Sequence, residues 1–358
     1  MGDAPIDPDK LQTTVRRVFG WLEGALVSGM IYLGDELGLY RAMNGAGPLT
    51  SQALAERTGL DERWVREWLH GQAAAELIEA RGEGRFELSP EGAIALAEEN
   101  HPAFAAGGFS GLPAQMRVLD KLPEAFRTGR GLPYDAFGEE GSRGIERSFA
   151  PWFRTLLVPF ALPRLDGVVE KLEAGGEAAD VGCGTGVAVL EMAKAFPASH
   201  FHGYEISEHA LKRAEENRVA AGLANVSFHD VRSDPLPAAP RFDLITTFDC
   251  LHDMTHPQET MEAVRAAIRP DGTWFIADIK ALPTFEENAE KNPMAALMYG
   301  FSVLSCMSSA LSEPGGAGLG TLGLHEDLCR EMAARAGFTR FRRCEIEHPM
   351  NAYYEARP

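Results

Sequence analysis

The chain has 358 residues, 45% of them hydrophobic and 24% charged, so it is long enough for two compact domains or for one large domain with a helical appendage. Its formal net charge of -18 argues against a general affinity for nucleic acid or for an anionic membrane, because both attract lysine and arginine. The five cysteines are scattered and never spaced CxxC, and neither a secretory leader nor a membrane-spanning run is visible, so we expect a cytoplasmic protein without disulfide bonds or structural zinc.

The first hundred residues are predicted to be mainly helical. Apolar residues recur at helical spacing over residues 11–35. A short helix capped by Thr50 or Ser51 follows, and Asp61 is placed to cap the next helix. Residues 77–88 contain two short β segments around a glycine-rich turn, as in a small hairpin. Helix, tight turn, helix and hairpin form the pattern of a winged helix.

Two regions that differ in their sequence pattern follow. Residues 101–170 are predicted to form a mostly helical connector, interrupted by proline and glycine. Residues 171–358 alternate strands with amphipathic helices, which predicts an α/β fold with a parallel sheet covered by helices, and an insertion at about 282–324 interrupts the alternation. The strands are expected at 177–181, 201–204, 226–229, 243–248 and 273–278, and the helices between them at 187–196, 208–221 and 259–268.

The clearest motif is a glycine-rich loop that follows an apolar strand and opens a helix: Asp180-Val-Gly182-Cys183-Gly184-Thr-Gly186. Glycine lets the backbone turn tightly and lets a ligand approach without a Cβ in the way, and the start of the helix offers unpaired N–H groups. The spacing is GxGxG, not the GxGxxG of nicotinamide-binding enzymes, and an acid precedes it.

Carboxylates end the next two predicted strands. Glu205 ends the second strand, where a carboxylate takes both hydroxyls of a ribose, and Asp230 ends the third, where we expect an adenine ring. Together with the loop, these elements resemble class I S-adenosylmethionine-dependent methyltransferases. The resemblance continues at residues 242–249 and 268–276, which are similar to that family's fourth and sixth motifs, and it covers the chain from about residue 171. A Rossmann-like fold without a ligand and a nicotinamide-binding enzyme are the alternatives.

The resemblance implies a Rossmann-like methyltransferase domain whose cofactor is S-adenosylmethionine. It implies that Gly182, Gly184 and Gly186 pass close to the methionine part of the cofactor, and that Asp180 supports this loop or binds the ammonium group. The other implied contacts come from the loop and from residues that end the strands: Cys183, Glu205 at the ribose, Asp230 at the adenine amino group, Ile206 and Val231 on the adenine faces, and Phe248 and Asp249 beside the methionine and the sulfonium.

Residues 250–254, Cys-Leu-His-Asp-Met, resemble the Leu-His-Asp-Trp stretch of small-molecule O-methyltransferases, in which the histidine is the general base. A phenol or alcohol has to lose its proton when it accepts a methyl group, and a neutral imidazole takes that proton near its ordinary pKa. We therefore expect His252 to be the base. The chain departs from the family pattern at Met254, which replaces the usual tryptophan, and the acid that holds the histidine in that family is not identified.

His252 has two other interpretations. It could line the cofactor or cap a helix without taking a proton. It could also bind a metal ion together with Asp253 and His256, which lie on one helical turn. Cation-dependent methyltransferases generally lack an N-terminal domain of the kind predicted here, so we expect no metal.

Four apolar side chains are candidates for the acceptor pocket. Trp152 and Phe153 lie in the connector, and Met298 and Phe301 lie in the insertion, which covers the cofactor's methyl group in this family. Apolar residues at helical spacing are more often plain core than pocket, and that alternative stays open for all four.

The winged helix at residues 1–100 has two candidate roles. A DNA-binding regulator that senses the cofactor needs a basic helix, but residues 1–99 contain 9 Lys/Arg against 17 Asp/Glu. In small-molecule O-methyltransferases the domain serves dimerisation, so the resemblance implies a homodimer without a nucleic-acid or membrane partner. The implied activity is methyl transfer to a small apolar or aromatic acceptor, at oxygen, and an N-, C- or carboxyl-methyltransferase is the alternative on the same scaffold.

Overall fold

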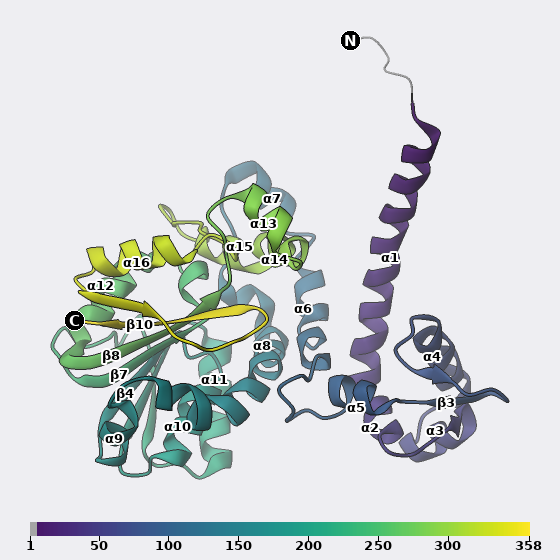
Figure 1. The fold of residues 1–358 in the computed structure, drawn as a ribbon, viewed down its shortest axis with the longest axis horizontal. Helices are drawn as coiled ribbons and strands as arrows, with labels where there is room; N and C mark the ends of the chain where they lie inside the picture. The colour runs from purple at the N-terminus through teal and green to yellow at the C-terminus, as the bar shows by residue number, and fades with distance from the viewer. Residues whose placement is uncertain (1–5) are drawn as a thin grey trace. The chain divides into compact units, whose positions relative to one another are not determined.

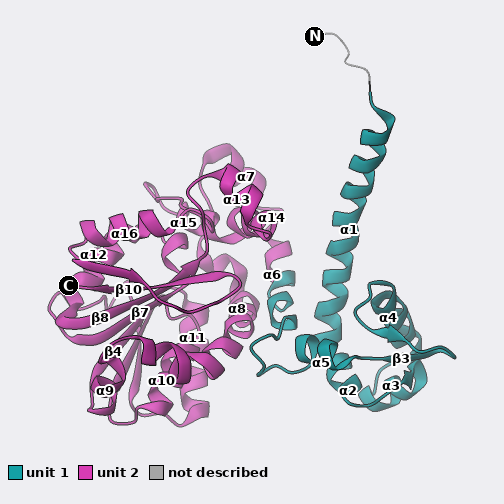
Figure 2. Ribbon diagram, viewed as in Figure 1, with its two compact units in different colours: residues 1–113 teal, residues 114–358 magenta. Residues whose placement is uncertain are grey.

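A computed structural model describes residues 6–358, and the chain divides after residue 113 into two compact units, which Figure 2 shows in different colours. Residues 1–5, the beginning of the domain predicted at 1–100, lie outside the described residues. Each unit has a hydrophobic core of its own. Among the described helices, none combines the length and the apolar character that a membrane crossing requires.

The first unit is mainly helical, as predicted. Its elements are α1 (Pro8–Glu36), α2 (Leu39–Met43), β1 (Leu49–Thr50), α3 (Ser51–Thr58), α4 (Glu62–Ala74), β2 (Glu79–Ala80), β3 (Arg85–Glu87), α5 (Pro90–Leu96) and η1 (Ala106–Phe109). Thr50 caps α3 and Asp61 caps α4, because their side-chain oxygens accept backbone N–H groups of the first turn. The strands form an antiparallel sheet in the order β1-β3-β2, which contains the predicted hairpin.

Helix α1 packs on the rest of the first unit through its C-terminal part. A Cβ at Gly34 would lie 2.4 Å from the ring of Trp68 and 2.6 Å from the ring of Tyr40, so only glycine allows this close approach. The indole Nε1 of Trp68 donates a hydrogen bond to the backbone oxygen of Met30 at 2.9 Å. By contrast, residues 6–26 are exposed along their whole length.

The second unit is an α/β domain on one seven-stranded sheet. Its strands are β4 (Glu177–Val181), β5 (His200–Glu205), β6 (Val226–Asp230), β7 (Phe242–Phe248), β8 (Ile268–Ile279), β9 (Arg340–Arg343) and β10 (Asn351–Arg357). Its helices are α6 (Leu112–Arg117), which spans the division between the units, α7 (Leu122–Thr128), η2 (Tyr134–Phe137), α8 (Gly138–Trp152), the π-helix η3 (Phe153–Ala161), η4 (Leu162–Arg164), α9 (Val168–Glu173), α10 (Val187–Ala195), α11 (Glu208–Ala221), η5 (Leu251–Asp253), α12 (Pro257–Ala267), α13 (Phe285–Lys291), α14 (Ala295–Phe301), the π-helix η6 (Ser302–Cys306), α15 (Met307–Ala310) and α16 (Glu326–Arg335).

The strand order is β6-β5-β4-β7-β8-β10-β9. The first five strands of this order are mutually parallel, whereas β10 is antiparallel to both of its neighbours. Helices α9, α10 and α11 lie on one face of the sheet, and α12 and α16 lie on the other (Figure 1). The predicted parallel sheet covered by helices is confirmed, and β9 and β10 lie outside the predicted elements.

Strand β8 begins at Ile268, earlier than the predicted start at residue 273. Phe242 pairs with Ile268, but Leu244 pairs with Thr273, so the intervening residues of β8 form a bulge. At Gly272 in this bulge, a Cβ would lie 3.0 Å from the backbone oxygen of Phe242. A bulge interrupts the two-residue period of a strand, and the alternation of side chains therefore underestimates its length.

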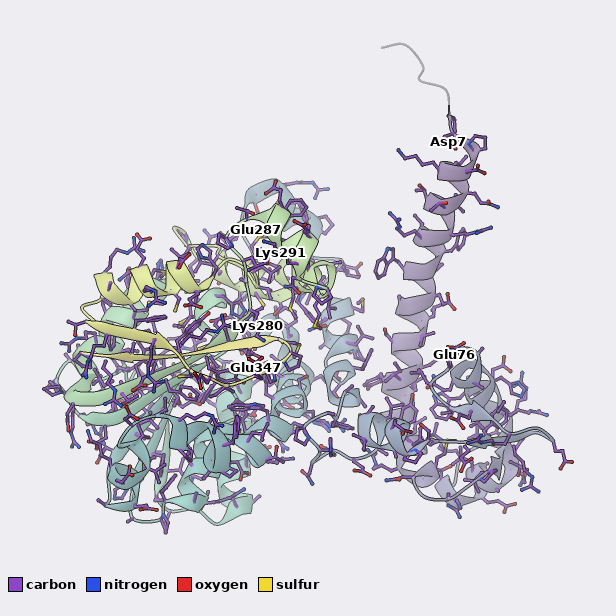
Figure 3. The ribbon with its side chains drawn as sticks, viewed as in Figure 1. Asp7, Glu76, Lys280, Glu287, Lys291 and Glu347 are labelled. Carbon is purple, nitrogen blue, oxygen red and sulfur yellow. The ribbon has the colours of Figure 1, made fainter. Side chains whose placement is uncertain are left out.

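The insertion predicted at 282–324 contains α13, α14, η6 and α15. The outer face of α13 is charged, and Glu287 and Lys291, labelled in Figure 3, form an ion pair of 3.6 Å there. The segment around Gly131 in the connector runs against the insertion, because its N–H donates to the backbone oxygen of Leu311 at 3.0 Å. Connector and insertion are therefore joined within the second unit.

Candidate active site

The carboxyl ends of the parallel strands meet at one edge of the sheet, and the strand order reverses there between β4 and β7. In open α/β sheets, ligands bind at this switch point. The structure brings most of the predicted site residues to that edge: the loop 182–186 after β4, Glu205 at the end of β5, Asp230 at the end of β6, Phe248 at the end of β7, and Asp249 and His252 after it.

The three loop glycines have left-handed backbone conformations, with φ of 73°, 52° and 77° at Gly182, Gly184 and Gly186. A Cβ at Gly182 would lie 2.7 Å from the Cβ of Cys250, and one at Gly186 would lie 2.5 Å from the ring of Phe228, so packing also requires glycine at these two positions. A Cβ at Gly184 would meet no described atom within 4 Å. The Cα of Gly184 therefore faces open space.

Asp180 and Cys183 are both buried beside this loop. The hydroxyl of Thr246 donates a hydrogen bond to the carboxylate of Asp180 at 2.6 Å, which ties the end of β4 to β7. Burial raises the pKa of Asp180 to about 7. The sulfur of Cys183 packs against β5, where a Cβ at Gly203 would lie 2.7 Å from it. Both side chains thus make packing contacts that hold the loop in place.

The carboxylate of Glu205 accepts three backbone N–H groups: that of Gly184 at 2.8 Å, that of Ile206 at 2.8 Å and that of Ser207 at 2.9 Å. Burial raises the pKa of Glu205, and these hydrogen bonds offset only part of that rise. A carboxylate has about four lone-pair sites, so accepting both hydroxyls of a ribose requires one of the three backbone bonds to be released.

Asp230 lies beside Glu205, because the two residues pair in register across β5 and β6. Its carboxylate accepts from the guanidinium of Arg232 at 2.8 Å, and this hydrogen bond lowers the pKa of Asp230. Ile206 is 46% exposed and Val231 is half-buried, so apolar surface stands next to Asp230. The residues predicted around the adenine ring are therefore together at this end of the edge.

Trp152 and Phe153 are packed beside Phe248. Their ring centroids lie 6.3 Å and 5.1 Å from that of Phe248, and Trp152 stacks on Tyr353 at 5.2 Å. Trp152 belongs to the core of the second unit and is 9% exposed, while Phe153 is half-buried against the same core. The rings of both residues therefore pack against the ring of Phe248 at the end of β7.

Met298 and Phe301 lie on α14 of the insertion. Met298 is buried in a small apolar cluster with Ile279, the last residue of β8, and Phe301 packs against that cluster. The structure thus places these two residues in an apolar cluster next to the end of β8.

Asp249 follows β7 with φ of 52°, a left-handed conformation that is uncommon for a residue other than glycine. Its N–H donates to the backbone oxygen of Ala277 at 2.9 Å, and its carboxylate accepts a hydrogen bond from the side-chain amide of Asn351. Burial and the neighbouring Asp278 raise the pKa of Asp249 to about 8. These two contacts hold the strained residue at the edge of the sheet.

His252 is buried, and its Nδ1 lies 2.7 Å from a carboxylate oxygen of Asp278 on β8. The same oxygen accepts the backbone N–H of Ile279 at 2.8 Å, so the carboxylate is fixed in place. Burial alone lowers the pKa of His252, but the charge and hydrogen bond of Asp278 outweigh it and raise that pKa well above its ordinary value. Asp278 is the acid that the sequence analysis does not identify.

Two residues of the site, Asp278 and Tyr134, are not among the predicted site residues, and the sequence marks them to different degrees. Asp278 ends the predicted strand 273–278, and parallel strands end at the same edge, so this rule could have placed it at the same edge as His252 but not in contact with it. Tyr134 of η2 lies beside the site, because the next residue, Asp135, accepts hydrogen bonds from the hydroxyl of Ser207 and from the N–H of Glu208 just after β5. No motif or periodicity marks Tyr134 in the sequence.

Three side chains with metal-binding atoms gather next to the edge: His252, Asp253 and Cys306 of η6, whose candidate ligand atoms all lie within 4.8 Å of one another. His256, the third ligand in the metal alternative, is not in this group. Its ring nitrogens lie 4.0 Å from Glu259 and from a second glutamate of the insertion.

The edge carries a concentration of carboxyl groups whose pKa values are raised. Burial raises the pKa of Asp180 and of Asp253 to about 7 and, with Asp278, that of Asp249 to about 8. Among the described residues, no lysine or arginine is a main cause of the pKa shifts of these carboxyl groups or of Glu205. A cationic ligand would stabilise their charged forms, and S-adenosylmethionine, with a sulfonium and an ammonium group, fits such a site.

Comparison with known families matches both units of the chain. Residues 172–316 match the family described as "Methyltransferase domain", and residues 25–98 match the family described as "Rv2258c-like winged HTH domain". Human N-acetylserotonin methyltransferase, solved in complex with SAM, has a TM-score of 0.68 over 100% of this chain and 99% of its own, at 17% identity. At that identity the likeness shows the fold, which agrees with the predicted fold class.

Two curated relatives are O-methyltransferases. Demethylspheroidene O-methyltransferase of Cereibacter sphaeroides is 29% identical over 279 residues, which are 73% of this chain and 69% of that protein. Ubiquinone biosynthesis O-methyltransferase of Leptothrix cholodnii is 27% identical over 127 residues, which are 35% of this chain and 53% of that protein. The chain thus matches about half the length of the second relative.

Proposed function

Because the chain belongs to the class I S-adenosylmethionine-dependent methyltransferases with an N-terminal winged-helix domain, we propose that it methylates a small apolar or aromatic acceptor at oxygen, with His252 as general base. The similarity of the chain to small-molecule O-methyltransferases supports oxygen as the methylated atom. The observation that carries the proposal is the buried hydrogen bond between His252 and Asp278. Its cofactor, S-adenosylmethionine, supplies an already activated methyl group, so the chain has to align the acceptor, exclude water and remove a proton.

The pair has the geometry that a histidine base requires. Asp278 accepts a hydrogen bond from the Nδ1–H of His252, so Nε2 is the ring nitrogen that can receive the proton of an acceptor hydroxyl. The carboxylate then stabilises the imidazolium that forms, as in other acid-oriented histidine bases. The half-buried Phe248 and Phe153 nearby support an apolar acceptor.

The residues predicted to bind the cofactor are proposed for that role, with the backbone of Gly184 and the carboxylate of Glu205 as its main polar contacts. Asp230, Ile206 and Val231 are proposed for the adenine. The acceptor pocket is proposed to lie between the connector and the insertion, the segments that Gly131 joins.

Replacing His252 tests the proposal. Formation of S-adenosylhomocysteine with a panel of phenols and lipophilic hydroxyquinones identifies an acceptor, and His252→Ala should then lower turnover by roughly 10²–10⁴-fold while cofactor affinity stays nearly unchanged. His256→Ala is the matched control, since His256 is partly exposed and outside the site. Turnover close to that of the wild type in His252→Ala would contradict the role of base and favour a nucleophile that has no proton to lose.

The variant Asp278→Asn tests whether Asp278 positions and charges His252 for catalysis or only stabilises the fold around it. The rate should rise with pH as His252 loses its proton, and Asp278 shifts this rise to higher pH because it raises the pKa of His252. The asparagine variant should therefore show a lower turnover together with a midpoint at lower pH. A lower turnover with an unchanged midpoint would leave Asp278 as a structural residue.

We also propose that the first unit mediates a homodimer. Apolar residues of α1 recur along one stripe at Leu11, Val15, Val18 and Leu22, and all four are 45–61% exposed. Such a stripe is typical of a helix that packs against another helix. We also propose a cytoplasmic location, because scattered cysteines without CxxC spacing suit a reducing compartment.

A further inference from the structure

The side chains of His252, Asp253 and Cys306 offer one nitrogen, one oxygen and one sulfur ligand atom within 4.8 Å of one another. Two of them come from the turn η5 after β7, and Cys306 ends the π-helix η6 in the insertion, far away in the sequence. Asp253 and Cys306 are half-buried, so an ion can reach them, whereas His252 is buried and fixed.

We propose that His252, Asp253 and Cys306 bind Zn²⁺, and that the bound ion blocks methyl transfer by occupying the imidazole nitrogen that takes the acceptor's proton. Zn²⁺ is the divalent ion that best fits a mixed set of histidine, carboxylate and thiolate ligands, with a water molecule in the fourth position. The binding half of this inference stands by itself, and the inhibitory half rests on the proposed function.

The surroundings of His252 match those of a zinc ligand. A zinc-bound histidine usually donates its other ring N–H to a carboxylate, which fixes the ring and its tautomer. Asp278 holds Nδ1 of His252 in that way at 2.7 Å, so Nε2 is the atom left for the ion.

The spacing requires only a small adjustment. Zinc-ligand bonds of roughly 2.0–2.3 Å place the ligand atoms of a tetrahedral site about 3.5 Å apart. Atoms within 4.8 Å therefore have to approach by about 1.3 Å at most, which rotation of the Asp253 and Cys306 side chains supplies. On binding, the thiol of Cys306 loses its proton to solvent and its sulfur forms the bond to the ion.

Titration of the full-length, chelator-treated protein with Co²⁺ tests the binding half, because Co²⁺ takes the place of Zn²⁺ and is coloured. One Co²⁺ per chain should give a sulfur-to-cobalt charge-transfer band and the visible bands of a tetrahedral ion, and Zn²⁺ should abolish both. Cys306→Ser should lose the charge-transfer band, and Asp253→Asn should weaken Co²⁺ binding by at least about tenfold.

Matched controls come from elsewhere in the chain. Cys344→Ser removes a buried cysteine of the core, and His256→Ala removes the neighbouring partly exposed histidine, so both variants should keep the band. Circular dichroism and S-adenosylhomocysteine affinity show whether each variant is folded. If Cys306→Ser does not fold, Asp253→Asn decides alone. A missing band in the wild type, a band that survives Cys306→Ser, or an unchanged Co²⁺ affinity in Asp253→Asn would overturn the site.

The inhibitory half is measured as the Zn²⁺ concentration that halves methylation, with each variant compared with its own metal-free rate. That concentration should rise at least about tenfold in Cys306→Ser and stay unchanged in Cys344→Ser. If the cobalt band forms as expected but His252→Ala methylates normally, the zinc site stands and the proposed base fails. If His252→Ala is inactive and no band forms, the base stands and the zinc site fails.

Discussion

The two units differ in the side chains that they place in unusual surroundings: the first exposes apolar side chains, and the second buries ionisable ones. In the N-terminal unit, large apolar side chains stand on the surface of α1, and those between Leu11 and Leu26 are 45–69% exposed. In the methyltransferase unit, ionisable side chains lie inside: Asp180 and His252 are 2% exposed, and Asp278 is 1% exposed.

Exposed apolar side chains and buried ionisable side chains both cost free energy in an isolated chain, and each arrangement indicates a different kind of binding partner. An exposed apolar stripe leaves surface in contact with water that a second apolar surface would cover. Buried carboxyl groups without a cationic neighbour resist ionisation, and a bound cation removes that penalty. We therefore propose that a second protein surface covers the apolar stripe of α1 and that the cofactor neutralises the sheet edge, and the following predictions test each half.

The largest effect is expected on α1. Replacing Val18 and Leu22 together by lysine should raise the dimer dissociation constant at least about 100-fold, because each protomer loses two apolar side chains worth roughly 1.5–3 kcal/mol each when fully buried. Sedimentation at micromolar concentration measures the shift from dimer to monomer. Glu23→Lys adds a similar charge at an exposed polar position and serves as the control. A wild-type protein that is monomeric at this concentration would contradict the proposal.

A smaller effect is expected at the end of β5. Glu205→Gln should weaken S-adenosylmethionine binding by roughly 10–100-fold, as expected when a charge-assisted hydrogen bond is lost. Glu208→Gln removes a neighbouring acid that is exposed and pairs with Arg232, so its affinity should be close to that of the wild type. Calorimetry gives both values. Equal affinities in Glu205→Gln and the wild type would remove Glu205 from the ribose.

The smallest effect is a dependence of cofactor affinity on pH. Asp180 and Asp253 have pKa values raised to about 7, and Asp249 to about 8. The cationic cofactor favours their charged forms, so binding lowers these pKa values and releases protons. Affinity for S-adenosylmethionine should therefore rise by roughly three- to tenfold between pH 6 and 8.

Calorimetry in buffers of different ionisation enthalpy counts the released protons. S-adenosylhomocysteine, which lacks the sulfonium charge, is the control and should show a weaker dependence. An affinity for S-adenosylmethionine that falls as the pH rises would contradict the role of the buried carboxyl groups in attracting the cation.

Local chemistry made much of this protein predictable from its sequence. Thr50 and Asp61 mark helix starts because a side-chain oxygen in the right place satisfies the first N–H groups of a helix. The glycine-rich loop and Glu205 are recognisable because a tight turn, a close approach of backbone and a strand end each require particular residues at short spacing. These features depend on neighbours within one or two elements.

Only the tertiary structure decided the rest of the site. Asp278 reaches His252 because β7 and β8 are parallel neighbours that end at the same edge, and Cys306 reaches it because the insertion folds back over that edge. Asn351 meets Asp249 through an antiparallel strand beyond the predicted elements. These contacts join residues far apart in the chain, and their geometry follows from strand order, register and packing, which residue spacing alone does not specify.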